Sequence, residues 1–151
     1  MMTTREILIN FGNETVKIIQ DNLASTGTNA SGETSQSLRS DMLNDNRVQV
    51  SGKEFIYVVE TGRKAGKRPP IEGIMKWLQT GKVSITGSIE SAAYAISKKI
   101  GEEGSKLFRE GGRTDIRTPA IDDQRVDELI NQIANAEALK TADAIIENTD
   151  G

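Results

Sequence analysis

Two consecutive prolines, Pro69 and Pro70, divide this 151-residue chain into stretches of different periodicity. Proline fixes its own φ and disfavours a helical conformation at the residue before it, so no regular element is expected to run through the pair. Upstream, residues 54–61 are rich in β-branched and aromatic side chains, which is typical of a strand. Downstream, residues 71–81 carry an apolar stripe of helical spacing. We therefore expect a strand before the prolines and a short helix that begins at Pro70 and ends at Gly81.

The N-terminal part of the chain has the pattern of a long amphipathic helix over residues 3–24. Thr3 and Glu6 have the spacing of a capping box. The expected apolar stripe consists of Leu8, Phe11, Thr15, Ile18, Ile19 and Leu23. A Ser, Thr and Gly-rich segment follows and predicts a loop at least through Glu33, because such side chains favour turns over helix.

The next segment predicts a small antiparallel β-meander. Residues 47–50 and 54–61 read as two strands joined by a turn around Gly52, and residues 37–44 are a candidate third strand. The strand at 54–61 carries apolar side chains on both faces. Such a strand is covered on both sides, either by a helix or by a neighbouring subunit.

Two longer helices are expected in the remainder of the chain. The first runs from Ser88 to about Phe108, and Gly101 and Gly104 would weaken its middle by about 1 kcal/mol each relative to alanine. Such glycines would accommodate the close approach of another backbone. The second helix covers residues 122–147, with an apolar side formed by Val126, Leu129, Ile130, Ile133 and Ile145. The fold class is therefore α+β: a long N-terminal helix, a small antiparallel β-meander, a proline-started short helix and two longer helices.

The composition argues against an enzyme. The chain has no cysteine and no histidine, so disulfides, thiolate metal sites and the common nucleophile–base pairs cannot be built. The adjacent carboxylate pairs Glu102-Glu103 and Asp122-Asp123 point about 100° apart on a helix and do not converge on one substrate. We expect no catalytic residue, no cofactor and no metal. No apolar run approaches the about 20 residues of a membrane span, and no signal peptide is recognisable, so we expect a soluble protein that is not secreted.

Charge is distributed unevenly along the chain. The net charge is −3, yet Arg63, Lys64, Lys67 and Arg68 form a basic loop that contains no acid, and residues 122–151 hold eight acids and two bases. The glycine spacing of this loop does not fit a Walker A phosphate loop, because three residues rather than four precede the Gly-Lys pair and Arg68 follows it. Three interpretations stay open: contact with a nucleic-acid backbone, a solvated turn, and docking onto an acidic partner.

Further interface candidates lie downstream of the basic loop. Trp77 stands on the short helix, where tryptophan is more often a core or interface residue than a ligand platform. Three arginines recur every four residues, but a glycine pair and Pro119 break any single helix that would carry them all; an extended loop that contacts a neighbour is the alternative. These arginines are Arg109, Arg113 and Arg117.

Two segments resemble the tail-completion and neck proteins of bacteriophages. "GETSQSLRS" resembles that family's Gly-x-Leu-Arg-x-Ser element, and "FIYVVETG" is similar to its tyrosine, glutamate and glycine signature at the last strand. The matching positions are Leu38, Arg39, Ser40, Tyr57, Glu60 and Gly62. The segment from Pro69 to Gly112 looks like the central helices of such connectors, especially ring proteins of short-tailed phages. The resemblance covers roughly residues 5–120; Val58 replaces the family's usual alanine, and the C-terminal helix has no counterpart.

The resemblance implies a structural protein of the virion, assembled in the host cytoplasm. Copies of the chain would form a head–tail connector ring, commonly dodecameric, in the neck or tail, next to the portal or an adjacent ring protein and around the DNA channel. Contact with packaged DNA would be non-specific. Residues 1–121 would be the connector-like α+β domain, and residues 122–151 an acidic helix that belongs to it or serves as a docking arm. The alternative is a small nucleic-acid-binding or regulatory module that uses the basic loop.

Overall fold

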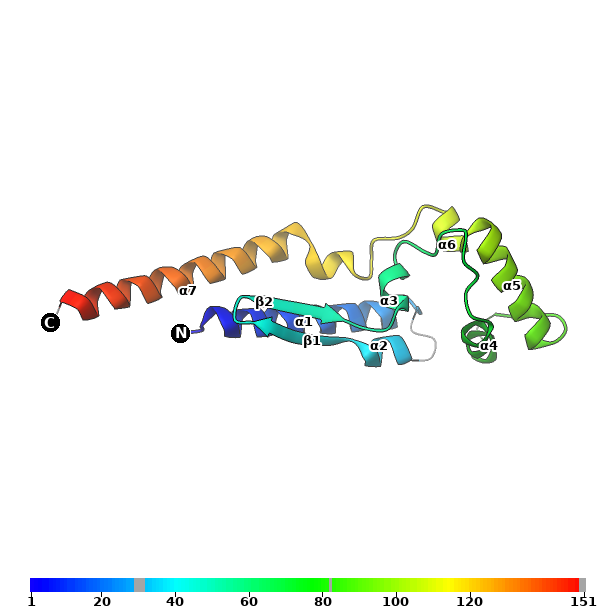
Figure 1. The fold of residues 1–151 in the computed structure, drawn as a ribbon, viewed down its shortest axis with the longest axis horizontal. Helices are drawn as coiled ribbons and strands as arrows, with labels where there is room; N and C mark the ends of the chain where they lie inside the picture. Colours follow the sequence, from blue (N-terminus) through cyan, green and yellow to red (C-terminus); the bar gives the residue numbers. More distant parts are fainter. Residues whose placement is uncertain (29–31, 82, 150–151) are drawn as a thin grey trace.

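The computed structural model describes residues 1–28, 32–81 and 83–149, and it is an elongated molecule of mixed helix and sheet (Figure 1). The expected α+β class is confirmed. The Ser, Thr and Gly-rich link is only partly described, since residues 29–31 lie outside the described ranges. The elements in chain order are α1 (Thr4–Ser25), α2 (Glu33–Ser37), β1 (Arg39–Asn44), β2 (Arg47–Ser51), α3 (Phe55–Val58), α4 (Ile71–Gln79), α5 (Ile89–Glu103), α6 (Lys106–Arg109), the 3-10 helix η1 (Thr118–Ile121) and α7 (Asp123–Thr149).

Helix α1 begins with the predicted capping box. The Thr3 hydroxyl accepts a hydrogen bond from the Glu6 backbone N–H at 3.3 Å, and the Glu6 carboxylate accepts one from the Thr3 N–H at 2.7 Å. The hydrogen bonds that the Glu6 carboxylate accepts from the Thr3 N–H and the Thr3 hydroxyl stabilise its charged form and lower the pKa of Glu6. The predicted stripe faces inward, with Leu8, Thr15, Ile19 and Leu23 buried and Phe11 and Ile18 half-buried.

The predicted β-meander is wrong in one strand. Strands β1 and β2 pair antiparallel from Arg39 opposite Ser51 to Asn44 opposite Arg47, so the candidate strand at 37–44 is confirmed. Residues 54–59, however, have helical backbone angles and form α3 with its flanks. A short apolar run suits a buried strand or a buried helix equally well. The helix prevails because it brings Ile56, Val59 and Glu60 to one buried side, and the segment around Gly52 leads into α3 and is no hairpin turn.

One glycine of α1 allows the hairpin to lie directly on this helix. A Cβ added at Gly12 would lie 2.7 Å from the Val48 Cγ2 atom and would overlap the Ser40 hydroxyl. The core lies at the other end of the helix and hairpin, where α1, α3 and η1 meet. Its buried residues are Ile19, Leu23, Leu38, Ile56, Val59, Ile116 and Ala120.

Helices α4, α5 and α6 form a separate lobe at one end of the molecule (Figure 1). Helix α4 begins after Pro70 and ends before Gly81, which has a φ of 72°, as predicted. Helix α5 begins after Ser88, whose hydroxyl accepts a hydrogen bond from the Ser91 N–H at 3.2 Å. The single helix expected as far as Phe108 is wrong. Gly104, at φ 85° and ψ 170°, ends α5, and Phe108 belongs to the short helix α6.

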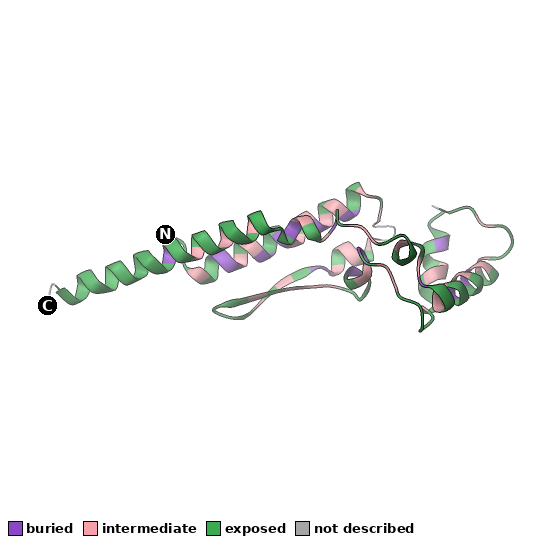
Figure 2. Ribbon diagram, turned by 90° about the horizontal axis from the view of Figure 1, so that it is seen from above, coloured by how far each residue is buried: buried purple, intermediate pink, exposed green. Residues whose placement is uncertain are grey.

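Helix α7 packs on α1 at its beginning and then continues past the N-terminus of the chain (Figure 1). Of its predicted apolar side, Leu129 and Ile133 are half-buried, whereas Val126, Ile130 and Ile145 are exposed. Figure 2 shows the exposed part as a continuous green helix. None of the helices in the described parts of the chain combines the length and the apolar character needed to cross a bilayer.

Candidate interaction surfaces

The basic loop lies along a stripe of small residues on α5. Ser97, Gly101 and Gly104 are spaced i, i+4 and i+7 and therefore share one face of the helix end. The Ser97 hydroxyl donates a hydrogen bond to the Pro69 carbonyl oxygen at 2.8 Å. The Gly66 N–H donates to the Gly101 carbonyl oxygen, also at 2.8 Å. Backbone and side-chain hydrogen bonds therefore fix residues 63–69 to α5.

The two glycines of this stripe permit the close backbone approach expected from the sequence. A Cβ at Gly101 would lie 2.5 Å from the Arg68 Cγ atom, and a Cβ at Gly104 would lie 3.0 Å from the Arg63 carbonyl oxygen. The same carbonyl oxygen accepts a hydrogen bond from the Ser105 N–H at 2.8 Å. At Gly101 the low helix propensity of glycine is thus offset by packing of the basic loop, whereas Gly104 lies just past the end of α5, where its positive φ favours glycine.

The fold brings an aromatic ring to the basic loop. The Arg68 guanidinium carbon lies 5.9 Å from the centre of the Tyr94 ring, and 54% of Tyr94 is exposed. Lys98 lies one turn further along α5, at the i+4 position that shares the face of Tyr94. Sequence reasoning missed Tyr94; its signal is the seven-residue spacing from Gly101, which places both on the helix face that the loop covers.

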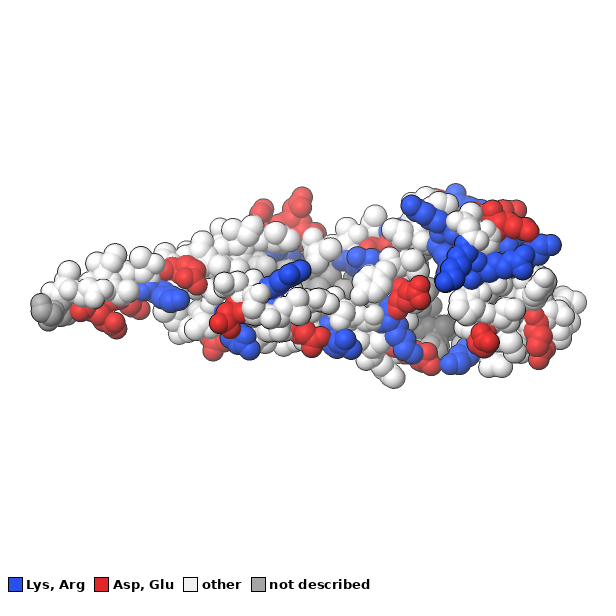
Figure 3. All heavy atoms as spheres, in the orientation of Figure 1, with Lys and Arg blue, Asp and Glu red and all other residues white. Residues whose placement is uncertain are grey.

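The positive charge extends over the whole lobe. The segment 63–109, which we call the basic lobe, holds ten basic and four acidic residues. Figure 3 shows a concentration of Lys and Arg at this end of the molecule. The lobe also exposes three aromatic side chains, with Trp77 on α4 exposed by 40%, Tyr94 on α5 by 54% and Phe108 on α6 by 38%. A surface with both cations and aromatic rings can bind acidic partners or nucleic acid.

The three arginines predicted to decorate a loop bind groups of their own chain. Arg109 lies 3.6 Å from the Glu103 carboxylate. Arg113 donates two hydrogen bonds to Asp115, at 2.6 and 2.8 Å, and these raise the pKa of Arg113 and lower the pKa of Asp115. Arg117 donates to the carbonyl oxygens of Ile56 and Tyr57, at 3.4 and 3.3 Å. Arg113 and Arg117 thus make contacts within the segment between α6 and η1 and from it to α3, whereas Arg109 joins α6 to the end of α5.

Glu60 is buried, with 7% exposure, and joins the end of α3 to this segment. Its carboxylate accepts hydrogen bonds from the Ile116 N–H at 3.3 Å, from the Thr118 N–H at 3.1 Å and from the Thr118 hydroxyl at 3.2 Å. Its carbonyl oxygen accepts a fourth from the Arg113 N–H at 2.8 Å. The sequence pattern around Glu60 does not predict these hydrogen bonds, because they depend on the helical conformation of α3.

The other residues that resemble the neck-protein motif hold packing positions or lie on the surface. Leu38 is part of the core, and Ser40 faces Gly12 of α1. Gly62 has a φ of 73°, and an added Cβ there would lie 2.7 Å from the Ser105 hydroxyl. Arg39 is exposed and pairs with Asp41, and Tyr57 is 53% exposed.

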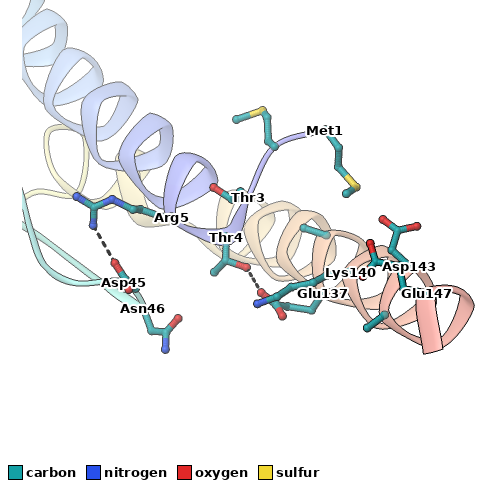
Figure 4. Close-up of a pocket in the computed structure, with 13 residues that line it drawn as sticks. Met1, Thr3, Thr4, Arg5, Asp45, Asn46, Glu137, Lys140, Asp143 and Glu147 are labelled. Atoms are coloured by element: carbon teal, nitrogen blue, oxygen red, sulfur yellow. Dashed lines mark hydrogen bonds and ion pairs between the residues drawn. The ribbon is translucent and has the colours of Figure 1, made fainter. Parts of the chain in front are cut away.

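A cleft of about 600 Å³ lies where α7 passes the N-terminus (Figure 4). Thr4 donates a hydrogen bond to Glu137 across the cleft, and Arg5 forms an ion pair of 3.2 Å with Asp45 in the β1–β2 turn. Met1 and Met2 line the cleft together with charged side chains of α7. The Thr4–Glu137 contact is positioned to hold α7 against the first turn of α1.

Beyond this point α7 presents both apolar and acidic side chains to solvent. Residues 137–149, which we call distal α7, are all exposed. They include Leu139, Ile145 and Ile146, which are 52%, 60% and 58% exposed. Within the described ranges, no group of three or more potential ligand side chains could hold a metal ion. The comparisons with family models, curated proteins and solved structures gave no match to this chain.

Proposed function

We propose that the chain is a non-enzymatic structural protein of a phage virion. It forms a ring in the neck or tail that joins the portal to the tail and surrounds the DNA channel. The observation that carries this proposal is the uncovered apolar surface of distal α7, where Leu139, Ile145 and Ile146 are each more than half exposed. An exposed apolar face of this kind is typical of a protein–protein contact surface. The resemblance to neck proteins supplies the kind of assembly.

The shape of the molecule supports an assembly between different surfaces. The basic lobe and distal α7 lie at opposite ends of an elongated chain (Figure 1), and they carry opposite charge. Contacts between two different surfaces generate rings when the rotation between neighbours closes. Residues 1–121 act as the connector-like domain in this proposal, and residues 122–151 as its docking arm.

Two measurements test the proposal. Mass photometry and negative-stain electron microscopy of the purified chain are expected to show a closed oligomer with one rotational symmetry. Mass spectrometry of purified virions is expected to detect the chain in stoichiometric amount. A chain that stays monomeric at every concentration and is absent from virions would contradict the proposal.

The second candidate is a nucleic-acid-binding module, and the Arg68–Tyr94 contact is the observation that favours it. Bases stack on exposed aromatic rings, and the cations around Tyr94 could neutralise phosphates. This function predicts an affinity for DNA that falls steeply with salt and disappears when the four cations of the basic loop become alanine. Fluorescence anisotropy with short single- and double-stranded DNA measures it, and no binding at low salt rejects it.

A further inference from the structure

We infer that distal α7 of one copy docks onto the basic lobe of the next copy, so that the chain associates head to tail. The inference rests on the proposed function and names the two surfaces that meet. Both surfaces are exposed in the single chain. They complement each other in charge, and the fold keeps them apart within one chain.

The docking face of distal α7 combines apolar and acidic side chains. Leu139, Asp143 and Ile146 are spaced i, i+4 and i+7 and therefore share one face of the helix. Glu147 follows Asp143 by one turn and extends the acidic row beside them. Distal α7 holds three acidic residues and a single basic one, Lys140.

The basic lobe presents the complementary combination. Its excess of positive charge surrounds exposed aromatic rings, of which Tyr94 lies directly beneath Arg68. Aromatic side chains and arginine are enriched at the centres of protein interfaces, and complementary charge at the rim steers the encounter and fixes the register. Leu139 and Ile146 would cover Tyr94 or Trp77, while Asp143 and Glu147 would face the cations of the basic loop.

The fold prevents a chain from making this contact with itself. Helix α7 is anchored near its start, where the Arg125 guanidinium lies 3.5 Å from the Glu14 carboxylate and 4.9 Å from the centre of the Phe11 ring. From this anchor α7 runs away from the basic lobe (Figure 1). The lobe that distal α7 reaches therefore belongs to another copy. Pairing of two distal α7 segments is disfavoured because it would bring their acidic rows together.

A charge-swap experiment tests the contact. The first variant reverses the loop with Lys64→Glu, Lys67→Glu and Arg68→Glu, which changes the net charge of residues 63–68 from +4 to −2. The second reverses the arm with Asp143→Lys and Glu147→Lys, which changes the net charge of distal α7 from −2 to +2. Each variant alone places like charges on the loop and the arm, so its self-association is expected to weaken at least tenfold. An equimolar mixture of the two is expected to regain mixed oligomers, because each arm then finds a loop of opposite charge. Mass photometry at low salt measures all three samples.

The control variant reverses exposed charges of α1 outside both surfaces, with Lys17→Glu and Asp21→Lys, and is expected to assemble as the original chain does. Circular dichroism checks that each variant stays folded, which is expected because all the altered side chains are exposed. The inference is overturned if either variant alone assembles normally, if the mixture does not associate, or if the original chain is monomeric at low salt. Detection of the chain in virions decides the proposed function independently of these outcomes.

Discussion

At Glu60, a single carboxylate connects two segments that are far apart in the chain. It lies just after α3 and accepts hydrogen bonds from the backbone N–H groups of Ile116, which precedes η1, and of Thr118, the first residue of η1. Ile116 is fully buried, so in the folded chain its N–H depends on the Glu60 carboxylate and not on water. A buried donor without a partner costs about 1–3 kcal/mol, and hydrogen bonds to charged groups are the stronger ones.

Replacing Glu60 therefore tests how much the loop depends on it. Glu60→Ala is expected to lower the free energy of unfolding by about 3 kcal/mol, since it leaves the buried Ile116 N–H and the part-buried Thr118 N–H without this acceptor. Glu60→Gln keeps one acceptor oxygen and should cost about half as much. Urea denaturation measures both variants, with the exposed Glu54→Ala as a control that should change little. An equal loss for Glu60→Ala and Glu54→Ala would contradict the assigned role.

At the scale of elements, the sequence predicted the helices that have a clear apolar periodicity or recognisable capping residues at their ends. Helix α1 has its capping box, α4 has Pro70 and Gly81 at its ends, and the long α7 was expected within two residues of its observed ends. The short α3 was not predicted, because four to eight apolar residues do not distinguish a strand from a helix. The burial of Glu60 and the contact of Arg68 with Tyr94 depend on tertiary packing, so the sequence alone could not show them.

The packing of the basic loop on α5 gives a prediction at this scale. Gly104→Ala is expected to destabilise the protein by about 3 kcal/mol, because it combines a backbone conformation reserved for glycine with contacts of 2.7 Å to the Phe108 ring and 3.0 Å to the Arg63 carbonyl oxygen of the loop. Gly81→Ala is the control: its φ is 72°, yet no atom lies within 4 Å of the added Cβ, so the cost should be about 1 kcal/mol.

Thermal and urea denaturation compare the two glycine variants. Hydrogen exchange adds a local readout, since the amides of Gly66 and Ser105, which bond the loop to the lobe, should lose protection in Gly104→Ala only. Equal destabilisation by both variants, with the loop amides still protected, would show that the loop does not need this close approach.

At the scale of the whole molecule, the fold leaves much of its apolar surface uncovered. The lobe formed by α4, α5 and α6 is joined to the part of the molecule that contains the core mainly by backbone hydrogen bonds between residues 60–63 and residues 105–113. Such a molecule is expected to be extended in solution. Small-angle X-ray scattering at high salt, where charge-driven association is screened, should give a radius of gyration clearly above the roughly 15 Å of a compact domain of this length. A value at or below that figure would mean that the lobe folds back onto the part that contains the core.

The length of distal α7 also gives the molecule a mechanical property. Its thirteen residues, 137–149, extend for about 20 Å beyond the contact of Glu137 with Thr4. Among the described residues, the hydrogen bond of Glu137 with Thr4 is the last one between α7 and α1, so a tilt of about 10° there would move the tip by roughly 3 Å. A change in the angle between α7 and the first turn of α1 thus changes the position of the tip. Identical copies can in this way contact neighbours at slightly different spacings.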